Sequence, residues 1–302
     1  MFYALNSQNQ LVHASTADLL KKYYCPVCHQ PVKLRTGKLN SAHFAHQHST
    51  FSNQHYDTNV HQAGKQLLMK WGNELGYDVQ SEVSFKAIQR RADVILKLPK
   101  SQVVIEYQCS PISATELTKR SRAYAQTGLQ CIWLVGKRYC LHGRISQHNA
   151  QFFRYHPNIG FYFVYLNAEM QRLELYYQIQ QAAFLRPKYR IKFLANLKEL
   201  IQFIHHAKEN HLNKISVKMR MHQIRNFNRA EAYSTGMTRM LQVQCYLNHL
   251  EFRQEVLRNL SSSFDYPIYR YSKVYFQIAV QLGINSKKLL YQMPFINYHN
   301  FI

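Results

Sequence analysis

Residues 90–108 read RRADVILKLPKSQVVIEYQ, and this stretch decides the fold of the central part of the chain. Residues 92–98 and 103–109 are two short apolar runs, which favours two β-strands. Because only residues 98–102 connect them, the two strands would form a hairpin.

Two acids, Asp93 and Glu106, interrupt these apolar strands, although acids are sparse between residues 77 and 136. The hairpin would place both carboxylates on one face, where they could bind a hard cation such as Mg²⁺. Gln108 follows two residues after Glu106 and would point to the same face. A metal there would activate water and bind a phosphate oxygen, as phosphodiester hydrolysis requires. Spacing alone leaves another interpretation open, because strand acids are also edge residues or partners of Arg.

The flanking segments predict an α/β core around the hairpin. Apolar residues recur at helical spacing over 56–75, and Gly76 follows as a C-terminal cap. A strand at 77–85 is expected before the hairpin, and a helix at 113–127 with a buried strand at 131–135 after it. This order predicts a mixed sheet flanked by helices.

The chain as a whole divides into four predicted parts. Two short strands and a Cys/His-rich stretch suggest a separate N-terminal module, and helical periodicity returns at Arg186 and runs through Phe193 and Leu194. The predicted parts are a zinc module at 1–52, the α/β core at 53–145, an aromatic-rich connecting segment at 146–185 with strands at 161–165 and 173–179, and a basic, mostly helical C-terminal domain at 186–302.

The charge of the chain indicates a polyanionic partner. Lys and Arg total 38 against 16 Asp and Glu, a formal net charge of +22. The basic residues are spread along the chain and do not gather on one amphipathic helix, which favours nucleic acid over a membrane surface. No apolar run reaches the roughly 18 residues of a membrane helix, and the start lacks the order of a signal peptide. We therefore expect a cytosolic protein with no membrane partner.

A cysteine–histidine cluster near the N-terminus predicts a structural zinc site. Cys25 and Cys28 form one pair and His43 and His46 another, each pair with two intervening residues. Two thiolates and two imidazoles suit tetrahedral Zn²⁺, and metal binding would help so small a module to fold. The alternative is an incidental CxxC beside a His-rich loop.

Several motifs together resemble a known family. They are Cys25-Pro-Val-Cys28, Pro31-Val32, His43-Phe-Ala-His46, Arg91-Ala-Asp93, Glu106-Tyr-Gln-Cys-Ser-Pro111, Arg120 with Tyr124, and Ile132-Trp133 before Gly136. This set resembles the CoiA-like competence proteins, and the order of Asp93 and Glu106-Tyr-Gln108 resembles the PD-(D/E)XK nuclease core with Gln in place of Lys. The resemblance is specific over about residues 1–137 and general afterwards.

The resemblance implies roles for individual residues. Asp93 and Glu106 would bind Mg²⁺ or Mn²⁺, Gln108 would occupy the position of the catalytic Lys, and Glu82 would complete the acidic cluster. Because Gln removes a positive charge, Lys65 is a candidate to replace it from the first helix, where it shares a face with His61. A solvated helix face is the alternative for those two residues.

Further residues are candidates for contact with DNA. His61 and Arg120 could meet phosphates and Tyr124 a base, although Arg120 and Tyr124 could instead simply flank the sheet. In the basic tail at 205–230, the candidates are Lys214, Lys218, Arg220 and Arg225, which would attract phosphates without sequence readout.

These features predict a metal-dependent DNA nuclease, or a factor derived from one, that acts on recombination intermediates during natural transformation. Its DNA would be single-stranded or branched, and the family resemblance implies a recombinase or strand-loading protein as partner. A non-catalytic DNA-binding mediator that delivers strands to a recombinase is the main alternative, favoured by Gln108. An RNA-binding factor would use the same charge but leave the paired acids unexplained.

Overall fold

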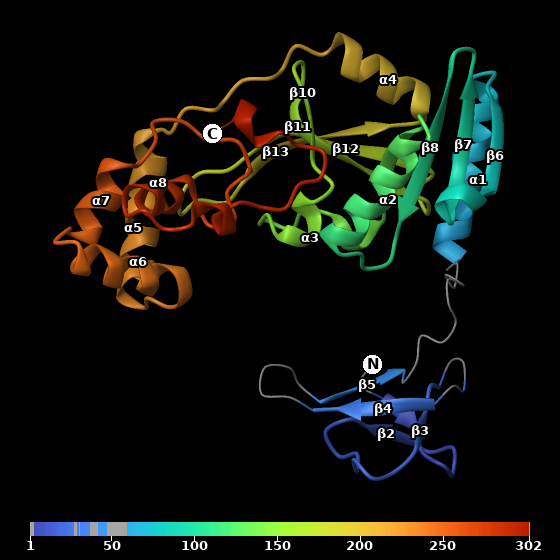
Figure 1. The fold of residues 1–302 in the computed structure, drawn as a ribbon, viewed down its shortest axis with the longest axis horizontal. Helices are drawn as coiled ribbons and strands as arrows, with labels where there is room; N and C mark the ends of the chain where they lie inside the picture. Colours follow the sequence, from blue (N-terminus) through green and yellow to red (C-terminus); the bar gives the residue numbers. More distant parts are fainter. Residues whose placement is uncertain (1–2, 27–28, 30, 37–41, 47–58, 302) are drawn as a thin grey trace. The chain divides into compact units, whose positions relative to one another are not determined.

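A computed structural model describes residues 3–26, 29, 31–36, 42–46 and 59–301 (Figure 1). The chain separates into two compact units, Met1–Tyr56 and Asp57–Ile302. Each has its own buried apolar cluster, as independent folding units do.

The first unit contains an antiparallel sheet in the strand order β2-β1-β3-β4-β5. Its strands are β1 (Tyr3–Leu5), β2 (Leu11–His13), β3 (Tyr23–Tyr24), β4 (Pro31–Arg35) and β5 (His43–His46). Alternation in β4 buries Val32 and Leu34 and exposes the residues between them, as expected of a sheet with one covered face. Phe44 of β5 packs into the same core.

The second unit is built on a mixed sheet in the order β13-β12-β11-β9-β8-β7-β6, with β10 paired to β11. Its elements, in chain order, are α1 (Asn59–Glu74), β6 (Asp78–Phe85), β7 (Arg90–Leu98), β8 (Ser101–Gln108), α2 (Ala114–Gln126), β9 (Gln130–Val135), α3 (Gln147–Ala150), β10 (Arg154–His156), β11 (Gly160–Asn167), β12 (Arg172–Gln180), β13 (Lys188–Leu194) and α4 (Leu197–His206). The pairs β8–β9 and β9–β11 are parallel and the others are antiparallel.

The predicted hairpin is confirmed, and local signals explain its neighbours. Leu98 pairs with Ser101, so β7 and β8 are joined by a tight turn. Gly76 has φ of +76°, which a glycine adopts at little cost and which ends α1. The side chain of Ser113 accepts a hydrogen bond from the amide of Glu116 at 3.1 Å and thereby caps α2.

Helices α1 and α2 cover opposite faces of this hairpin (Figure 1). Leu68 of α1 packs in one cluster with Ile105, whereas Tyr124 of α2 packs in another with Val104. Since Val104 and Ile105 are consecutive in β8, their side chains lie on opposite faces. Side chains from both helices can therefore reach the hairpin, each from its own side.

The segment expected to be a connection is part of the central sheet. Strands β11 and β12 pair with each other, and β11 joins β9 in parallel. The helix expected to include Phe193 and Leu194 is also wrong, because Lys188–Leu194 forms β13 and the helix begins at Leu197. The sequence KYRIKFL alternates basic and apolar residues, which is a strand signal.

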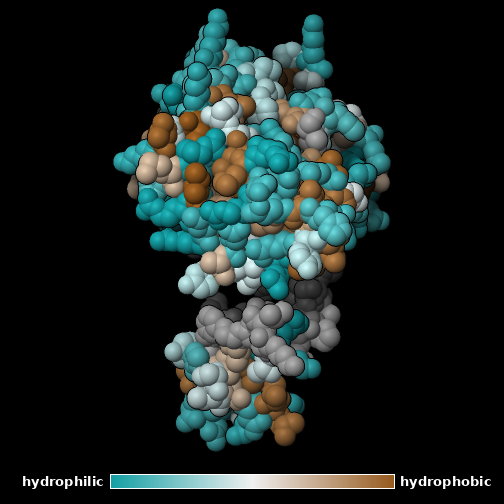
Figure 2. Space-filling view, turned by 90° about the vertical axis from the view of Figure 1, so that its left-hand side faces the viewer, coloured by the Kyte–Doolittle hydropathy of each residue, from teal (hydrophilic) through white to brown (hydrophobic). Residues whose placement is uncertain are grey.

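The C-terminal region is helical, as predicted. Its main helices are α5 (Val217–Ala232), α6 (Gly236–Leu247), α7 (Phe252–Arg258) and α8 (Lys273–Gln281). They share an apolar core that includes Phe227, Leu241, Val256 and Ile278. Figure 2 views the end of the molecule formed by these helices, where hydrophilic residues cover most of the surface between separate apolar patches. Within the described residues, no helix is both long and apolar enough to span a membrane.

Candidate functional site

Three acids lie in one row across β6, β7 and β8. The β7–β8 ladder ends at Val94↔Ile105, and its register, extended by one residue, sets Asp93 opposite Glu106. In the β6–β7 pair, Ser81↔Val94 and Val83↔Ala92 are matched, so the same register sets Glu82 opposite Asp93. Glu82 has φ of +57°, an irregular backbone conformation at this point. Both ladders are therefore interrupted at the acidic row.

Basic side chains surround Glu82 and Asp93. Lys65 of α1 forms an ion pair with one oxygen of Glu82, and Nε of Arg91 lies 2.7 Å from the other. Nε2 of His61 lies 3.3 Å from Oδ2 of Asp93. That same oxygen accepts a 2.9 Å hydrogen bond from the amide of Tyr107, which fills the gap where the β7–β8 ladder opens.

Glu106 is the most buried of the three acids, with only 1% of its side chain exposed. Arg120 donates to its Oε2 at 2.6 Å and the Tyr124 hydroxyl donates to its Oε1 at 2.5 Å. Burial raises the pKa of Glu106 to about 7 and the negative charge of Asp93 adds to the rise, whereas Arg120 and Tyr124 oppose it. Asp93 and Glu106 are thus electrostatically coupled, as neighbouring carboxylates are.

Gln108 is held by the segment that follows its strand. Its Nε2 donates to the carbonyl oxygen of Ser110 at 2.7 Å and to the Ser110 hydroxyl at 3.0 Å. The Tyr139 hydroxyl donates to that same carbonyl at 2.6 Å. With its amide nitrogen committed to Ser110, Gln108 presents an acceptor oxygen where a lysine would present a charged donor.

The structure decides between the alternatives for the helix residues. His61 and Lys65 lie against Asp93 and Glu82, and Lys65 is only 3% exposed, so a solvated helix face is wrong for this pair. Arg120 and Tyr124 bind Glu106, and Tyr124 is fully buried. A buried ring offers no face to a base, which is inconsistent with the predicted contact between Tyr124 and DNA.

Sequence reasoning missed two residues of this site, Arg91 and Ser110. Arg91 pairs with Glu82, and Ser110 fixes the amide of Gln108. Both stand inside motifs that carry the family resemblance, in Arg91-Ala-Asp93 and in Glu106-Tyr-Gln-Cys-Ser-Pro111. Arg91 stands two residues before Asp93, and Ser110 stands two residues after Gln108. This closeness in sequence was the signal that could have identified both residues.

The predicted zinc ligands lie largely outside the described residues. Cys25 is buried in the N-terminal core, and its carbonyl oxygen accepts a 2.9 Å hydrogen bond from the amide of His29. Cys28 and the side chains of His43 and His46 are not among the described parts. Zinc binding by these four residues stays a prediction.

The predicted DNA-binding residues of the tail lie on and before α5. Lys218 and Arg225 are exposed on that helix, and His222 and Arg229 are exposed on the same stripe, at positions i, i+4, i+7 and i+11. Lys214 is exposed before the helix. Arg220 differs, because its guanidinium is partly buried and donates to the carbonyl oxygen of Ser261 at 2.5 Å.

Two family models match this chain. Residues 57–208 match the family model of the nuclease-like domain of competence protein CoiA, and residues 7–54 match the model of its N-terminal domain. The chain belongs to the CoiA competence protein family. Competence protein CoiA of Bacillus subtilis (strain 168) is 25% identical over 199 residues, which cover 65% of this chain and 50% of that protein. The matched stretch thus spans about half the length of that relative. No solved structure matches the chain.

Proposed function

We propose that this protein is a metal-dependent DNA nuclease, or a factor derived from one, that acts on DNA recombination intermediates during natural transformation. The observation that carries the proposal is the register that sets Asp93 opposite Glu106 where the β7–β8 ladder opens. Strand carboxylates beside Gln108 support the PD-(D/E)XK pattern that the resemblance implies. The match to a nuclease-like family domain supports the same assignment.

The donor set fits a hard divalent cation such as Mg²⁺ or Mn²⁺. Asp93 uses only Oδ2 in its hydrogen bonds within the described residues, which leaves Oδ1 for a ligand. The charge of Asp93 raises the pKa of Glu106, so a cation held by both carboxylates would relieve their repulsion. Such an ion would polarise a phosphate oxygen and lower the pKa of a bound water.

The neighbouring side chains keep these two carboxylates in place. The Tyr107 amide and His61 fix Asp93, while Arg120 and Tyr124 fix Glu106. The acceptor oxygen of Gln108 lies on the same face as Glu106 and could orient a water molecule by hydrogen bonding. Lys65, which is buried against Glu82, is the cation of α1 that could support charge on a reacting phosphate.

A single experiment tests the enzymatic assignment. Single-stranded, duplex and branched DNA are incubated with the protein and Mg²⁺ or Mn²⁺, and products are resolved on denaturing gels. We expect Asp93→Ala and Glu106→Ala to abolish cleavage while DNA affinity survives, because the carboxylates hold the metal and do not attract phosphate. Gln108→Ala should lower turnover by roughly 10- to 1000-fold, the cost of one well-placed polar group. Cleavage at the wild-type rate in the Asp93→Ala, Glu106→Ala double variant would refute this active site.

One observation favours a second candidate, a non-catalytic DNA-binding mediator that delivers strands to a recombinase. Both oxygens of Glu106 already accept hydrogen bonds, from Arg120 and Tyr124, and Gln108 carries no charge. In that case all three DNA forms stay intact with either metal, and the three substitutions change only stability. Binding of Mn²⁺ measured by isothermal titration calorimetry separates the candidates, because the mediator needs no metal at Asp93 and Glu106.

We also propose that Cys25, Cys28, His43 and His46 hold one structural zinc ion. The hydrogen bond between His29 and Cys25 supports the proposal, because a CxxC pair presents two thiolates to one ion only where the chain on either side of it comes close together.

A further inference from the structure

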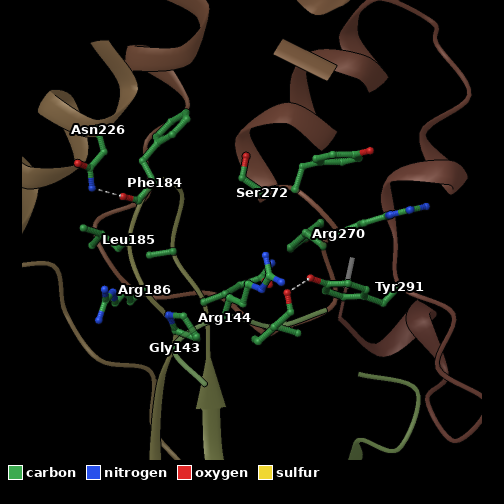
Figure 3. Close-up of a pocket in the computed structure, with 15 residues that line it drawn as sticks. Gly143, Arg144, Phe184, Leu185, Arg186, Asn226, Arg270, Ser272 and Tyr291 are labelled. Carbon is green, nitrogen blue, oxygen red and sulfur yellow. Dashed lines mark hydrogen bonds between the residues drawn. The ribbon is translucent and has the colours of Figure 1, made fainter. Parts of the chain in front are cut away.

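A pocket of about 290 Å³ lies outside the acidic row, between the loop at 143–145, the segment at 181–187 and the start of α8 (Figure 3). Three arginines line it, Arg144, Arg186 and Arg270, and we call it the arginine pocket. Arg186 and Arg270 come from opposite walls, with Arg144 between them. None of its 15 lining residues is an acid.

The three arginines differ from those of the acidic row in having no acidic partner. Arg91 and Arg120 each pair with a glutamate, whereas Arg144, Arg186 and Arg270 form no ion pair within the described residues. All three are exposed. Arg is the residue best suited to bind phosphate with two parallel hydrogen bonds.

The N-terminus of α8 at the same pocket also favours an anion. Ser272 lines the pocket and caps α8 by accepting from the Tyr275 amide at 3.2 Å, so the helix N-terminus lies at this wall.

An exposed aromatic ring indicates the kind of molecule to which the anionic group would belong. Tyr271 lines the pocket and is 50% exposed, and the Arg270 guanidinium carbon lies 5.9 Å from its ring centroid. A ring of this kind stacks on a flat partner such as a nucleobase. The volume of about 290 Å³ is at the lower end of the range for small-molecule sites, which suits a single small ligand.

The arginine pocket is connected to the acidic row through the edge of the sheet. Gln108 pairs with Val135, so β8 and β9 end at the same edge. The chain continues from β9 through Tyr139, whose hydroxyl binds the Ser110 carbonyl that also holds Gln108. The loop that carries Arg144 follows directly. The arginine pocket therefore takes one of its walls from the chain segment that leaves β9.

We propose that the arginine pocket binds the phosphate of a nucleotide. The phosphate contacts the arginines and the α8 N-terminus, and the base stacks on Tyr271. A free nucleotide and a nucleotide within a DNA strand offer the same chemistry, and the strand as the source rests on the proposed function.

Isothermal titration calorimetry on the full chain, in low salt with EDTA to prevent cleavage, tests the proposal. The probes are thymidine, thymidine monophosphate, inorganic phosphate and short oligo(dT) strands with and without a 5′-phosphate. Thymidine should not bind, because it lacks the phosphate. Arg144→Ala and Arg270→Ala should each weaken phosphate-dependent binding by at least about tenfold, the scale of one charge-assisted contact. Arg144→Lys keeps the charge but loses the planar fork, so its affinity should be intermediate.

The matched control is Arg239→Ala, which removes an exposed arginine of α6 outside the pocket. It changes the net charge equally and should alter affinity by less than about twofold. Binding of the monophosphate identifies a free nucleotide as ligand; binding of oligo(dT) alone, sensitive to Arg144 and Arg270, identifies the strand. Losses no larger in the pocket variants than in Arg239→Ala would overturn the proposal, as would thymidine binding as tightly as its monophosphate.

Thermal unfolding keeps the test independent of folding defects and of catalysis. A ligand that binds only the folded protein should raise the melting temperature of the wild type and not that of a folded pocket variant. If the nuclease assignment fails, no DNA is cut but phosphate binding persists. If the pocket assignment fails, Arg144→Ala binds normally whether or not DNA is cut.

Discussion

The Tyr124 hydroxyl donates a 2.5 Å hydrogen bond to Oε1 of Glu106, so a fully buried phenol on α2 positions a strand carboxylate. This contact links the second helix to the acidic row. It is also one of the interactions that keep the pKa of Glu106 from rising further.

Removing that hydroxyl should weaken metal binding without emptying the core. In Tyr124→Phe the ring still packs edge-on against Phe85, but Glu106 loses one donor. We expect the pKa of Glu106 to rise, Mn²⁺ affinity at neutral pH to fall, and stability to drop by about 1–3 kcal/mol. Calorimetric titration and thermal unfolding measure the two effects. Unchanged Mn²⁺ affinity in a folded Tyr124→Phe protein would argue against Glu106 as a ligand.

Metal binding should depend on pH through Glu106. Its pKa lies at about 7 in the folded protein, so below that pH Mn²⁺ must displace a proton. The apparent affinity should fall by up to about tenfold per pH unit as the pH drops below 7, and level off above it. Asp78→Asn is the control, because Asp78 of β6 is paired with Lys97 of β7, at the end of these strands far from the acidic row. A flat profile between about pH 5.5 and 7 would contradict the assignment of the pKa.

In metal-free buffer, the titration of Glu106 should also make the free energy of unfolding depend on pH. The pKa of Glu106 is raised from 4.5 in the unfolded reference to about 7, so the folded state binds the proton more tightly. The stabilisation is complete below about pH 4.5 and is lost as the pH rises through about 7. Relative to Glu106→Gln, the free energy of unfolding of the wild type should therefore decrease across this window in urea titrations. An increase in the relative free energy of unfolding over this pH range would contradict the raised pKa of Glu106.

Gly64→Ala should displace the helix that carries His61 and Lys65. A Cβ at Gly64 would overlap Cε1 of Tyr107, whose hydroxyl is fixed by a 3.1 Å hydrogen bond to the Leu166 carbonyl. Overpacking of this kind costs about 1–3 kcal/mol and outweighs the gain in helix propensity. Gln66→Ala on the exposed face of α1 is the control and should be neutral or slightly stabilising. Equal melting temperatures for both variants would show that the contact is not tight.

Purified protein should contain one zinc ion per chain, measured by elemental analysis. Cys25→Ser and Cys28→Ser should each remove it, because a thiolate ligand is lost. Cys245→Ser, which changes a buried cysteine of α6, should leave the zinc content unchanged. Zinc that persists at full stoichiometry in both ligand variants would refute the site.

The exposed stripe of α5 should contribute to DNA affinity through charge alone. Lys218→Glu with Arg225→Glu should weaken binding and lower the slope of log affinity against log salt by about one per lost phosphate contact. Lys287→Glu with Lys288→Glu makes the same change in net charge at another exposed site and serves as the control. Equal losses in the two double variants would indicate a general effect of net charge, not a surface on α5.

The sequence by itself determined the local parts of this protein. Apolar runs and a short connection predicted the hairpin of Asp93 and Glu106, and Gly76 and Ser113 marked helix ends where the backbone needs them. These signals act over a few residues, so no distant contact is needed to read them. The motifs also identified the family, because each is a short run of residues that can be read without knowing the fold.

Only the tertiary structure decided what each functional side chain contacts. The alignment of Glu82 with Asp93 depends on the register of the β6–β7 pair, and the partners of Glu106 come from a helix whose rotation on the sheet no short pattern specifies. Strands β11 to β13 extend the sheet because their apolar faces need β9 and one another as neighbours. The arginine pocket joins segments more than a hundred residues apart, from Arg144 to Arg270. Such contacts follow from burying distant apolar surfaces together, which composition and periodicity do not encode.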